Sequence, residues 1–376
     1  MINAKLSVVF GVPLPASNSS APTLTLRAFA IVPRPPTARP FNFVRSSSDP
    51  DLTGGDIGFG VCLPTYTVWS LRSLSEAATV AEEVGFDSVW VSDHFFLPQE
   101  ATKAVGGNVR TRGLVDAWST LACLVPVTSR IKLGTCVSNL PLRNPVELAR
   151  KASTLDHFSQ GRVILGVGSG WFRDEFEAFG YEFEPFGIRM AKTIEGIRLM
   201  RQIWESKGPA TFAGNYYSIG GAELNPKPFR GSIPIWLGGA SGPALSAVAE
   251  LGDGWIPWCP TERAFKEGAA RICQRTKAVG RDIESVRFGA CFVTYVAETQ
   301  VEVRRGCDRF LSHRPDFVSG EKRAMFGTPA QLAEDLRNYV GLGMKHIVFE
   351  LALSGKKTHD MVRLLGEGLI ASYGSP

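Results

Sequence analysis

The sequence lacks several features that would assign it to a protein class at once. It contains no run of 18 consecutive apolar residues, so it offers no membrane-spanning helix. Its seven cysteines include no C-x-x-C pair, which excludes the common zinc spacings and a compact disulfide framework. Its five histidines form no H-x-H or H-x-x-x-H pair. We therefore expect no metal site and do not favour a metal-dependent hydrolase.

The body of the chain also lacks net charge. The 376 residues carry a formal charge of +5, but the first 48 contain Lys5 and four arginines and no Asp or Glu. The remaining residues balance 36 basic against 36 acidic side chains. Because nucleic-acid binding needs a basic face, we expect a small-molecule substrate, no nucleic acid and no membrane partner.

Residues 1–55 differ in composition from the rest of the chain. They are rich in Pro and Ser and show no sustained apolar period, so they cannot bury enough surface to fold alone. We interpret them as a disordered or mis-assigned N-terminal extension, with a transit peptide or a weak signal sequence as alternatives. Residues 56–376 are the expected folded domain, and the expected location is cytoplasmic.

From residue 56 onward, short apolar runs alternate with helical patterns. The first expected helix has a capping box at Ser73 and Glu76. Later helices begin at Asn144-Pro145 and at Thr328-Pro329, where a cap precedes a first-turn proline. The expected strands are 57–63, 88–91, 131–135, 163–167, 235–237, 255–257, 287–295 and 346–350.

Eight strands that are each followed by a helix predict an α/β fold of the (β/α)8 TIM-barrel type. Residues 206–232 interrupt the alternation and predict an insertion after strand four, with a small hairpin at 212–219. An open doubly wound sheet is the alternative, but no G-x-G-x-x-G follows the first strand.

In a barrel, functional groups gather where strands end and loops begin. Asp93 and His94 directly follow strand two, and an imidazole there can give or take a proton near neutral pH. Structural hydrogen bonding is the alternative for this histidine. Strand three leads into small residues and a polar Asn139, which an ordinary loop before a helix would also explain.

Glycines follow two other strands. The sequence after strand four, Gly168-Ser169-Gly170-Trp171, suggests close approach of a ligand to the backbone beside an apolar wall. The loop after strand five runs directly into a helix, where exposed amides could hold a phosphate. It consists of Gly238, Gly239, Ala240 and Ser241. A tight structural turn is the alternative for this second loop, and the glycine-rich turn after strand four is by itself a weak signal.

Together these loops resemble the luciferase-like superfamily of flavin- and coenzyme F420-dependent oxidoreductases. Six segments stand in family order: SDHF at 92–95, LGTCVSNLPLRNP at 133–145, RVILGVGSGW at 162–171, PIWLGGASGPA at 234–244, GDGW at 252–255 and GTPAQLAEDL at 327–336. No single segment is decisive, but their order on a barrel pattern is specific.

The resemblance implies a site at the carboxyl ends of the strands. Many members have a non-prolyl cis peptide after strand three, which here would join Cys136 to Val137 and lie against the cofactor ring. The resemblance places Asn139 and the loop 168–171 beside the ring and residues 238–241 at the phosphate. It implies that His94 is the acid or base, oriented by Asp93 or by backbone groups. Dimers are common in the family.

One position departs from the family's sugar-phosphate dehydrogenases. Those enzymes carry a Glu just after the strand-four glycines, where this chain has Trp171, so the resemblance argues against a sugar-phosphate substrate. The expected function is hydride transfer between coenzyme F420 and a small organic substrate, in an apolar cavity built partly by Trp69, Phe95 and Trp171. The alternatives are an FMN-dependent monooxygenase that uses O2 and a non-catalytic flavin- or deazaflavin-binding protein.

Overall fold

The computed structural model describes residues 57–68, 70–106, 113–320, 322–352 and 357–374. The predicted N-terminal extension at 1–55 and Trp69 lie outside these residues. Within the described ranges, no helix combines the length and apolar character needed to cross a membrane.

Eight parallel strands close into a barrel, which confirms the predicted fold. β1 pairs with β2 on one side and with β12 on the other, and the remaining strands complete the ring between them. Two short strands add to the rim, where β4 (Ser138–Asn139) pairs with β5 and β11 (Met325–Gly327) pairs with β10. In ring order the strands are β1 (Gly58–Leu63), β2 (Ser88–Val91), β3 (Lys132–Thr135), β5 (Val163–Gly168), β8 (Ile235–Leu237), β9 (Gly254–Trp255), β10 (Arg287–Val296) and β12 (His346–Leu351).

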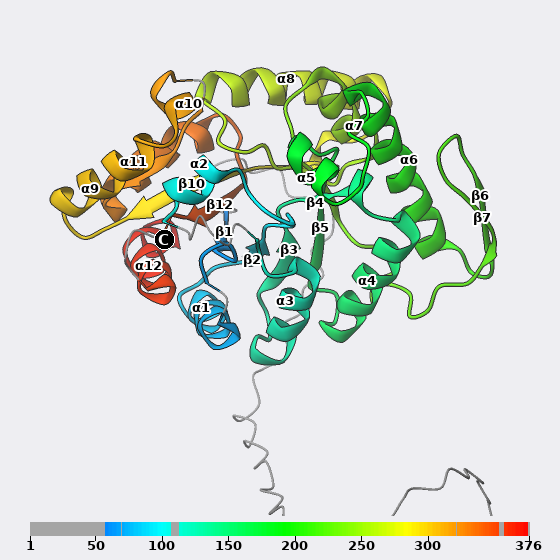
Figure 1. The fold of residues 1–376 in the computed structure, drawn as a ribbon, viewed down its shortest axis with the longest axis horizontal. Helices are drawn as coiled ribbons and strands as arrows, with labels where there is room; N and C mark the ends of the chain where they lie inside the picture. Colours follow the sequence, from blue (N-terminus) through cyan, green and yellow to red (C-terminus); the bar gives the residue numbers. More distant parts are fainter. Residues whose placement is uncertain (1–56, 69, 107–112, 321, 353–356, 375–376) are drawn as a thin grey trace, which may run out of the picture. The chain divides into compact units, whose positions relative to one another are not determined.

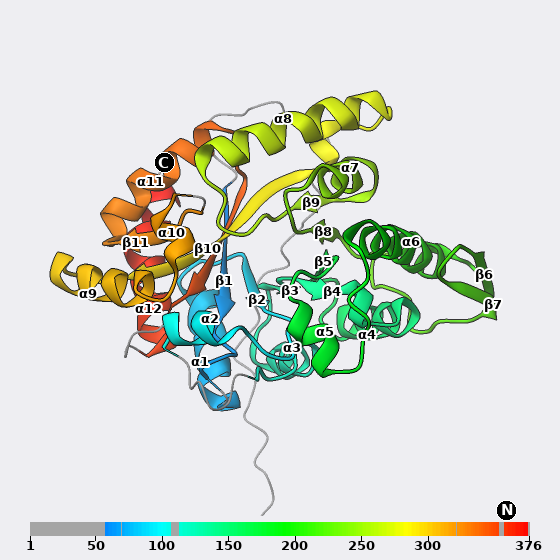
Figure 2. The ribbon, with the colours of Figure 1, turned by 45° about the horizontal axis from the view of Figure 1, so that its top comes forward.

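Helices surround this barrel, and Figures 1 and 2 show them packed side by side around the strands. The outer helices are α1 (Leu71–Glu83), α3 (Ala117–Leu124), α4 (Pro145–Phe158), α6 (Phe186–Glu205), α7 (Gly242–Leu251), α8 (Glu262–Ala278), α11 (Pro329–Gly341) and α12 (Thr358–Leu365). Further helices lie in the connections, namely α2 (Gln99–Ala104), α5 (Arg173–Ala178), α9 (Gln300–Leu311) and α10 (Pro315–Val318), and α13 (Ala371–Gly374) follows α12.

The helix starts largely follow the sequence signals. The Asn144 side chain accepts hydrogen bonds from the amides of Val146 and Glu147, at 2.9 and 3.3 Å, and so caps α4. Thr328 and Gln331 form the predicted capping box of α11.

The predicted cap of the first helix is wrong. α1 begins at Leu71, and its N-cap is Ser70, whose hydroxyl accepts a hydrogen bond from the Ser73 amide at 3.3 Å. Glu76 instead forms an ion pair with Arg72, one turn earlier, at 2.9 Å. The helix therefore starts a few residues before the first apolar position of its pattern.

The predicted hairpin is present after α6 and therefore follows the fourth barrel strand. It consists of β6 (Ala210–Ala213) and β7 (Ser218–Ala222), which are antiparallel and lie at the right of Figure 1. The Glu195 carboxylate on α6 accepts hydrogen bonds from the amides of Asn215, Tyr216 and Tyr217 at 2.7–2.8 Å. These three bonds fasten the hairpin turn to the helix.

Two indole rings fill the inside of the barrel. Trp90 on β2 and Trp236 on β8 lie with ring centroids 5.4 Å apart. Neighbouring strands carry glycines at the same level, and a methyl group on Gly60 or Gly254 would lie 2.6 Å from one of the indoles. The lumen is therefore a packed core rather than a channel.

His346 lies in the same lumen, nearer the amino ends of the strands. Its Nε2 atom is 2.8 Å from the hydroxyl of Ser88, and only 5% of the residue is exposed. Burial, with a smaller contribution from the charge of Arg287, lowers the pKa of His346 from 6.5 to about 3. The imidazole is therefore neutral in the folded protein at ordinary pH.

This buried imidazole predicts a loss of stability in mild acid. The unfolded chain takes up a proton near pH 6.5, whereas the folded chain does so only near pH 3, so stability falls as the pH is lowered between these values. The free energy of unfolding should decrease by ~2 kcal/mol between pH 6.5 and about pH 5, as measured by urea denaturation. His346→Gln should remove this difference, whereas His157→Gln, at an exposed histidine, should keep it. An equal pH dependence in His346→Gln and the parent would refute the assignment.

Candidate active site

Three of the predicted loops meet at the carboxyl ends of β3, β5 and β8. Asn139 is the register partner of Gly168, and Ser138 is the partner of Val167. The amide of Gly238 donates a 2.9 Å hydrogen bond to the carbonyl oxygen of Val167. The predicted segments 136–139, 168–170 and 238 therefore line one place at the mouth of the barrel.

The backbone between β3 and β4 bulges toward the two glycine loops. The peptide bond between Cys136 and Val137 is cis, as the resemblance implied. A methyl group added to Gly168 would lie 2.9 Å from the Val137 side chain, and one added to Gly238 would lie 3.4 Å from it. Glycine at these positions leaves a narrow space along Val137, where a flat ring could lie against the backbone.

Asn139 supplies unused hydrogen-bonding groups beside this space. It is 4% exposed, and neither its amide nitrogen nor its amide oxygen has a partner among the described residues. A methyl group on Gly170 would lie 2.6 Å from the Asn139 oxygen, so the two residues are in close contact. An unpaired buried amide is costly, and a heterocycle with donors and acceptors along its edge would satisfy it. The residues present therefore fit a flavin or deazaflavin ring.

The loop after β8 presents backbone amides at the start of α7. Gly239 has a φ of +89°, which favours glycine, and Ser241 caps the helix by accepting a hydrogen bond from the Ala244 amide at 3.4 Å. Gly239, Ala240 and Ser241 are exposed. The predicted phosphate loop thus lies at an accessible helix start on the same rim as the ring site.

His94 is held by a glutamate that the sequence analysis did not identify. The Nδ1 atom of His94 lies 3.0 and 3.1 Å from the two carboxylate oxygens of Glu175, a fully buried residue of α5. The Phe95 amide also donates to this carboxylate, at 2.6 Å. Because a carboxylate only accepts hydrogen bonds, Nδ1 carries a hydrogen and Nε2 is left for other partners. Among the described residues, Nε2 has no hydrogen-bond partner.

Asp93 has a different set of contacts from those expected. Its carboxylate accepts a hydrogen bond from the Ser138 hydroxyl at 2.6 Å and pairs with both Nε and Nη2 of Arg143. The side chain that contacts the His94 imidazole is therefore Glu175 and not Asp93. Asp93 instead joins the loop after β2 to the strand β4 and to the start of α4, next to the imidazole. Its charge also raises the pKa of Arg143, against the opposing effect of burial.

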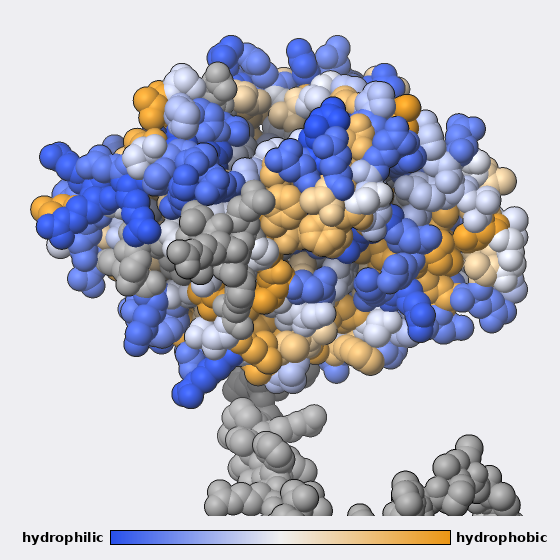
Figure 3. Space-filling view, in the orientation of Figure 1, coloured by the Kyte–Doolittle hydropathy of each residue, from blue (hydrophilic) through white to orange (hydrophobic). Residues whose placement is uncertain are grey.

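Aromatic side chains form one wall of the mouth. Trp171 is 62% exposed and meets the His94 ring edge-on, with centroids 6.0 Å apart. Phe95 lies 4.3 Å from Phe179, centroid to centroid, and so joins the loop after β2 to the end of α5. Figure 3 shows an apolar patch beside α5. Trp171 and Phe179, which lie just before and just after this helix, are exposed hydrophobic residues. The expected contribution of Trp69 lies outside the described residues.

A second acidic residue that the sequence analysis did not single out lies at the end of β12. The Glu350 carboxylate accepts a 2.6 Å hydrogen bond from Nε1 of Trp258, which follows β9. Burial raises the pKa of Glu350, although Trp258, Arg314 and His94 each lower it. A sequence signal existed, because His346, Val348 and Glu350 alternate along one face of a strand. No such pattern pointed to Glu175. It lies on a short helix together with two other acidic residues, Asp174 and Glu177, and nothing in the sequence distinguishes it from them.

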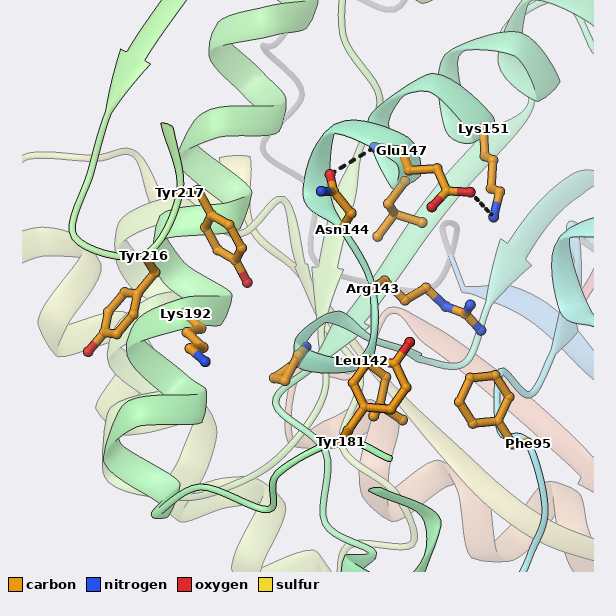
Figure 4. Close-up of a pocket in the computed structure, with 12 residues that line it drawn as sticks. Phe95, Leu142, Arg143, Asn144, Glu147, Lys151, Tyr181, Lys192, Tyr216 and Tyr217 are labelled. Carbon is orange, nitrogen blue, oxygen red and sulfur yellow. Dashed lines mark hydrogen bonds and ion pairs between the residues drawn. The ribbon is translucent and has the colours of Figure 1, made fainter. Parts of the chain in front are cut away.

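A separate cavity of about 450 Å³ lies beside the mouth. Figure 4 shows it between the start of α4, helix α6 and the hairpin, with Lys192 between Tyr216 and Tyr181. Its cationic groups are already paired: Arg143 with Asp93, Lys151 with Glu147 and Lys192 with Glu184. This cavity shares Phe95 and Arg143 with the mouth but contains none of the glycine loops.

Comparisons with known proteins identify the family. A family model described as luciferase-like monooxygenase matches residues 57–319. An F420-dependent glucose-6-phosphate dehydrogenase from Amycolatopsis mediterranei is 30% identical over 322 residues, covering 78% of this chain and 91% of that protein. A similarly named protein from Nocardia farcinica is 31% identical over 329 residues, covering 78% and 90%.

Solved structures share the fold at lower sequence identity. An F420-dependent secondary alcohol dehydrogenase in complex with an F420-acetone adduct superposes with a TM-score of 0.71 at 21% identity, covering 84% of this chain and 99% of that one. The EDTA monooxygenase of Chelativorans sp. BNC1 superposes with a TM-score of 0.72 at 14% identity, covering 86% and 95%. The structural neighbours thus include an F420-dependent dehydrogenase and a monooxygenase.

Proposed function

The chain belongs to the luciferase-like family of oxidoreductases, and we propose that it transfers a hydride between coenzyme F420 and a small organic substrate. The observation that carries the proposal is the unpaired amide of Asn139, set between the cis peptide at Val137 and the glycines at the end of β5, Gly168 and Gly170. Relatives about 30% identical to this chain are named as F420-dependent. This similarity favours the deazaflavin over FMN.

Different residues of the mouth have different roles in the proposed reaction. Val137, Asn139 and the glycines 168 and 170 hold the ring, and the amides of 239–241 take the phosphate of its side chain. When bound, the deazaflavin supplies or accepts the hydride. His94 gives or takes the accompanying proton through Nε2, because Glu175 fixes the opposite nitrogen. Asp93 positions this loop through Arg143 and Ser138 and does not handle the proton itself.

The substrate is not a sugar phosphate in this proposal. Trp171 stands where the sugar-phosphate dehydrogenases of the family carry a glutamate, and its ring lies against His94. Exposed Phe179 adds apolar surface to the same wall. The mouth therefore favours an apolar compound with an electrophilic carbon or an activated double bond.

Titration of the purified protein with F420 and with FMN, followed by absorbance and fluorescence, tests the cofactor. We expect saturable F420 binding and much weaker FMN binding. Asn139→Ala should weaken F420 binding about tenfold, because one or two hydrogen bonds to the ring are lost. FMN binding with consumption of O2 by the reduced protein would support the monooxygenase alternative. F420 binding without oxidation of its reduced form by any carbonyl or alkene acceptor would support a non-catalytic carrier.

A further inference from the structure

Glu350 is the uppermost lumen-facing residue of β12. Its register partners are Cys62 on β1 and Val293 on β10, so it lies at the mouth between two neighbouring strands. The residue is half-buried, which means that part of the side chain reaches the surface of the mouth. It stands close enough to His94 for the two charges to interact.

Trp258 fixes which oxygen of this carboxyl group is free. The indole Nε1–H can only donate, and it donates to Oε2 of Glu350 at 2.6 Å. In the protonated acid, Oε2 is therefore the carbonyl oxygen and Oε1 carries the hydrogen. Among the residues that the structure describes, Oε1 has no hydrogen-bond partner. The O–H group is thus available to a ligand in the mouth.

The surroundings favour the neutral form of this carboxyl group. Burial raises the pKa of Glu350 more than its hydrogen bond and its positive neighbours lower it. Arg314 is largely occupied by Asp316, whose carboxylate it binds through two hydrogen bonds of 2.9 and 2.7 Å. The titratable and charged groups that interact with Glu350 from the neighbouring elements are Cys62, Tyr66, His94, Cys259, Cys291 and Arg314.

We propose that Glu350 is a catalytic residue that donates a hydrogen bond from Oε1 to the carbonyl oxygen of the substrate. The substrate class is then a ketone, an aldehyde or a conjugated carbonyl compound. This inference rests on the proposed oxidoreductase function and adds a residue to it. An acid that stays neutral in an apolar site is a strong donor to an oxygen on which negative charge develops.

The step balances without a proton from Glu350. In the reducing direction, reduced F420 would supply the hydride: its C–H bond would break and a new C–H bond would form at the electrophilic carbon of the substrate, with the electron pair passing from one bond to the other. The π electrons of the carbonyl group move to oxygen, where the hydrogen bond from Glu350 stabilises them. His94 gives the proton that completes the alcohol or enol, and it regains that proton from water. The oxidising direction uses the same groups in reverse.

Infrared spectroscopy of the cofactor-free protein tests whether Glu350 is the neutral acid. We expect a C=O stretching band of a protonated carboxyl group at about pH 7, which disappears at higher pH and is absent from Glu350→Gln. Glu334→Gln, at an exposed glutamate, should keep the band. A spectrum in which the band is missing from the parent, or is unchanged in Glu350→Gln, overturns the inference.

A carbonyl probe then tests the contact itself. The C=O band of bound 2-cyclohexen-1-one should lie at lower frequency in the parent than in Glu350→Leu; equal frequencies overturn the inference. With reduced F420 and this enone, Glu350→Leu should lower kcat about 100-fold and Glu350→Gln, which retains a donor, roughly tenfold. F420 affinity should not change in either variant.

The two proposals fail in different ways. A parent protein that does not bind F420 refutes the proposed function, while the infrared experiments still decide the state of Glu350. A parent that binds F420 and reduces the enone no faster than Glu350→Leu refutes the role of Glu350 alone.

Discussion

Replacing His94 with glutamine is expected to lower turnover at least about 100-fold while F420 binds with nearly unchanged affinity. General acid–base catalysis by a positioned imidazole contributes a factor of 10² to 10⁴, roughly. Glutamine can keep a hydrogen bond to the Glu175 carboxylate, which His94 contacts at 3.0 Å, but it cannot carry the proton of the reaction. The measurement is single-turnover oxidation of reduced F420 by a carbonyl acceptor, with the F420 dissociation constant determined in parallel.

The matched control is His157→Gln, a replacement of an exposed histidine on α4. It should leave both turnover and F420 binding at the parental values. If His94→Gln turns over at the parental rate, the imidazole has no part in the proton transfer. If it loses F420 binding as well as turnover, His94 holds the cofactor or its loop and is not primarily an acid–base group.

Gly166→Ala is expected to lower the free energy of unfolding by about 3 kcal/mol and to abolish F420 binding. A methyl group at Gly166 would overlap the carbonyl oxygen of Thr135, which is backbone and cannot turn away. The Thr135 hydroxyl also bonds to both the amide and the carbonyl of Gly166, at 3.1 and 2.9 Å, and so ties β3 to β5. Pushing these strands apart would displace Val137, which forms one side of the ring site.

Gly187→Ala provides the comparison for this variant. Gly187 lies in the first turn of α6, and nothing is within 4 Å of the position that its methyl group would take. Its unfolding free energy should stay within ~1 kcal/mol of the parent. Urea denaturation of the three proteins, with F420 titration of each, gives the measurement. A Gly166→Ala protein as stable as Gly187→Ala would show that the strands tolerate the added group.

The barrel could be predicted from sequence because its strands are short apolar runs between glycines and polar turns. The apolar run Val163 to Val167, with three glycines among residues 166–170, needs no tertiary information to be recognised. The helix α5 was missed because six residues do not establish a helical period. The helix α9 was missed because charged residues outnumber the three buried positions that would reveal its apolar face.

The site was predicted one residue at a time, whereas its contacts are between distant segments. The sequence placed His94 and Asp93 next to each other and suggested that they interact. In the structure the two side chains turn to different partners, Glu175 at a separation of 81 residues and Arg143 at a separation of 50. Both partners depend on how α5 and α4 pack against the mouth, which no local pattern specifies.

The two tryptophans inside the barrel limit how this enzyme can acquire new specificity. Trp90 and Trp236 fill the lumen below the proposed ring site. The strands that face them carry glycines at this level. Trimming either indole would leave a cavity in this packed lumen and would lower the stability by about 3 to 5 kcal/mol. These two rings therefore set the depth of the proposed site, and selection or design would have to reshape it from the rim: from α5, the hairpin after α6 and the loop that carries Trp258.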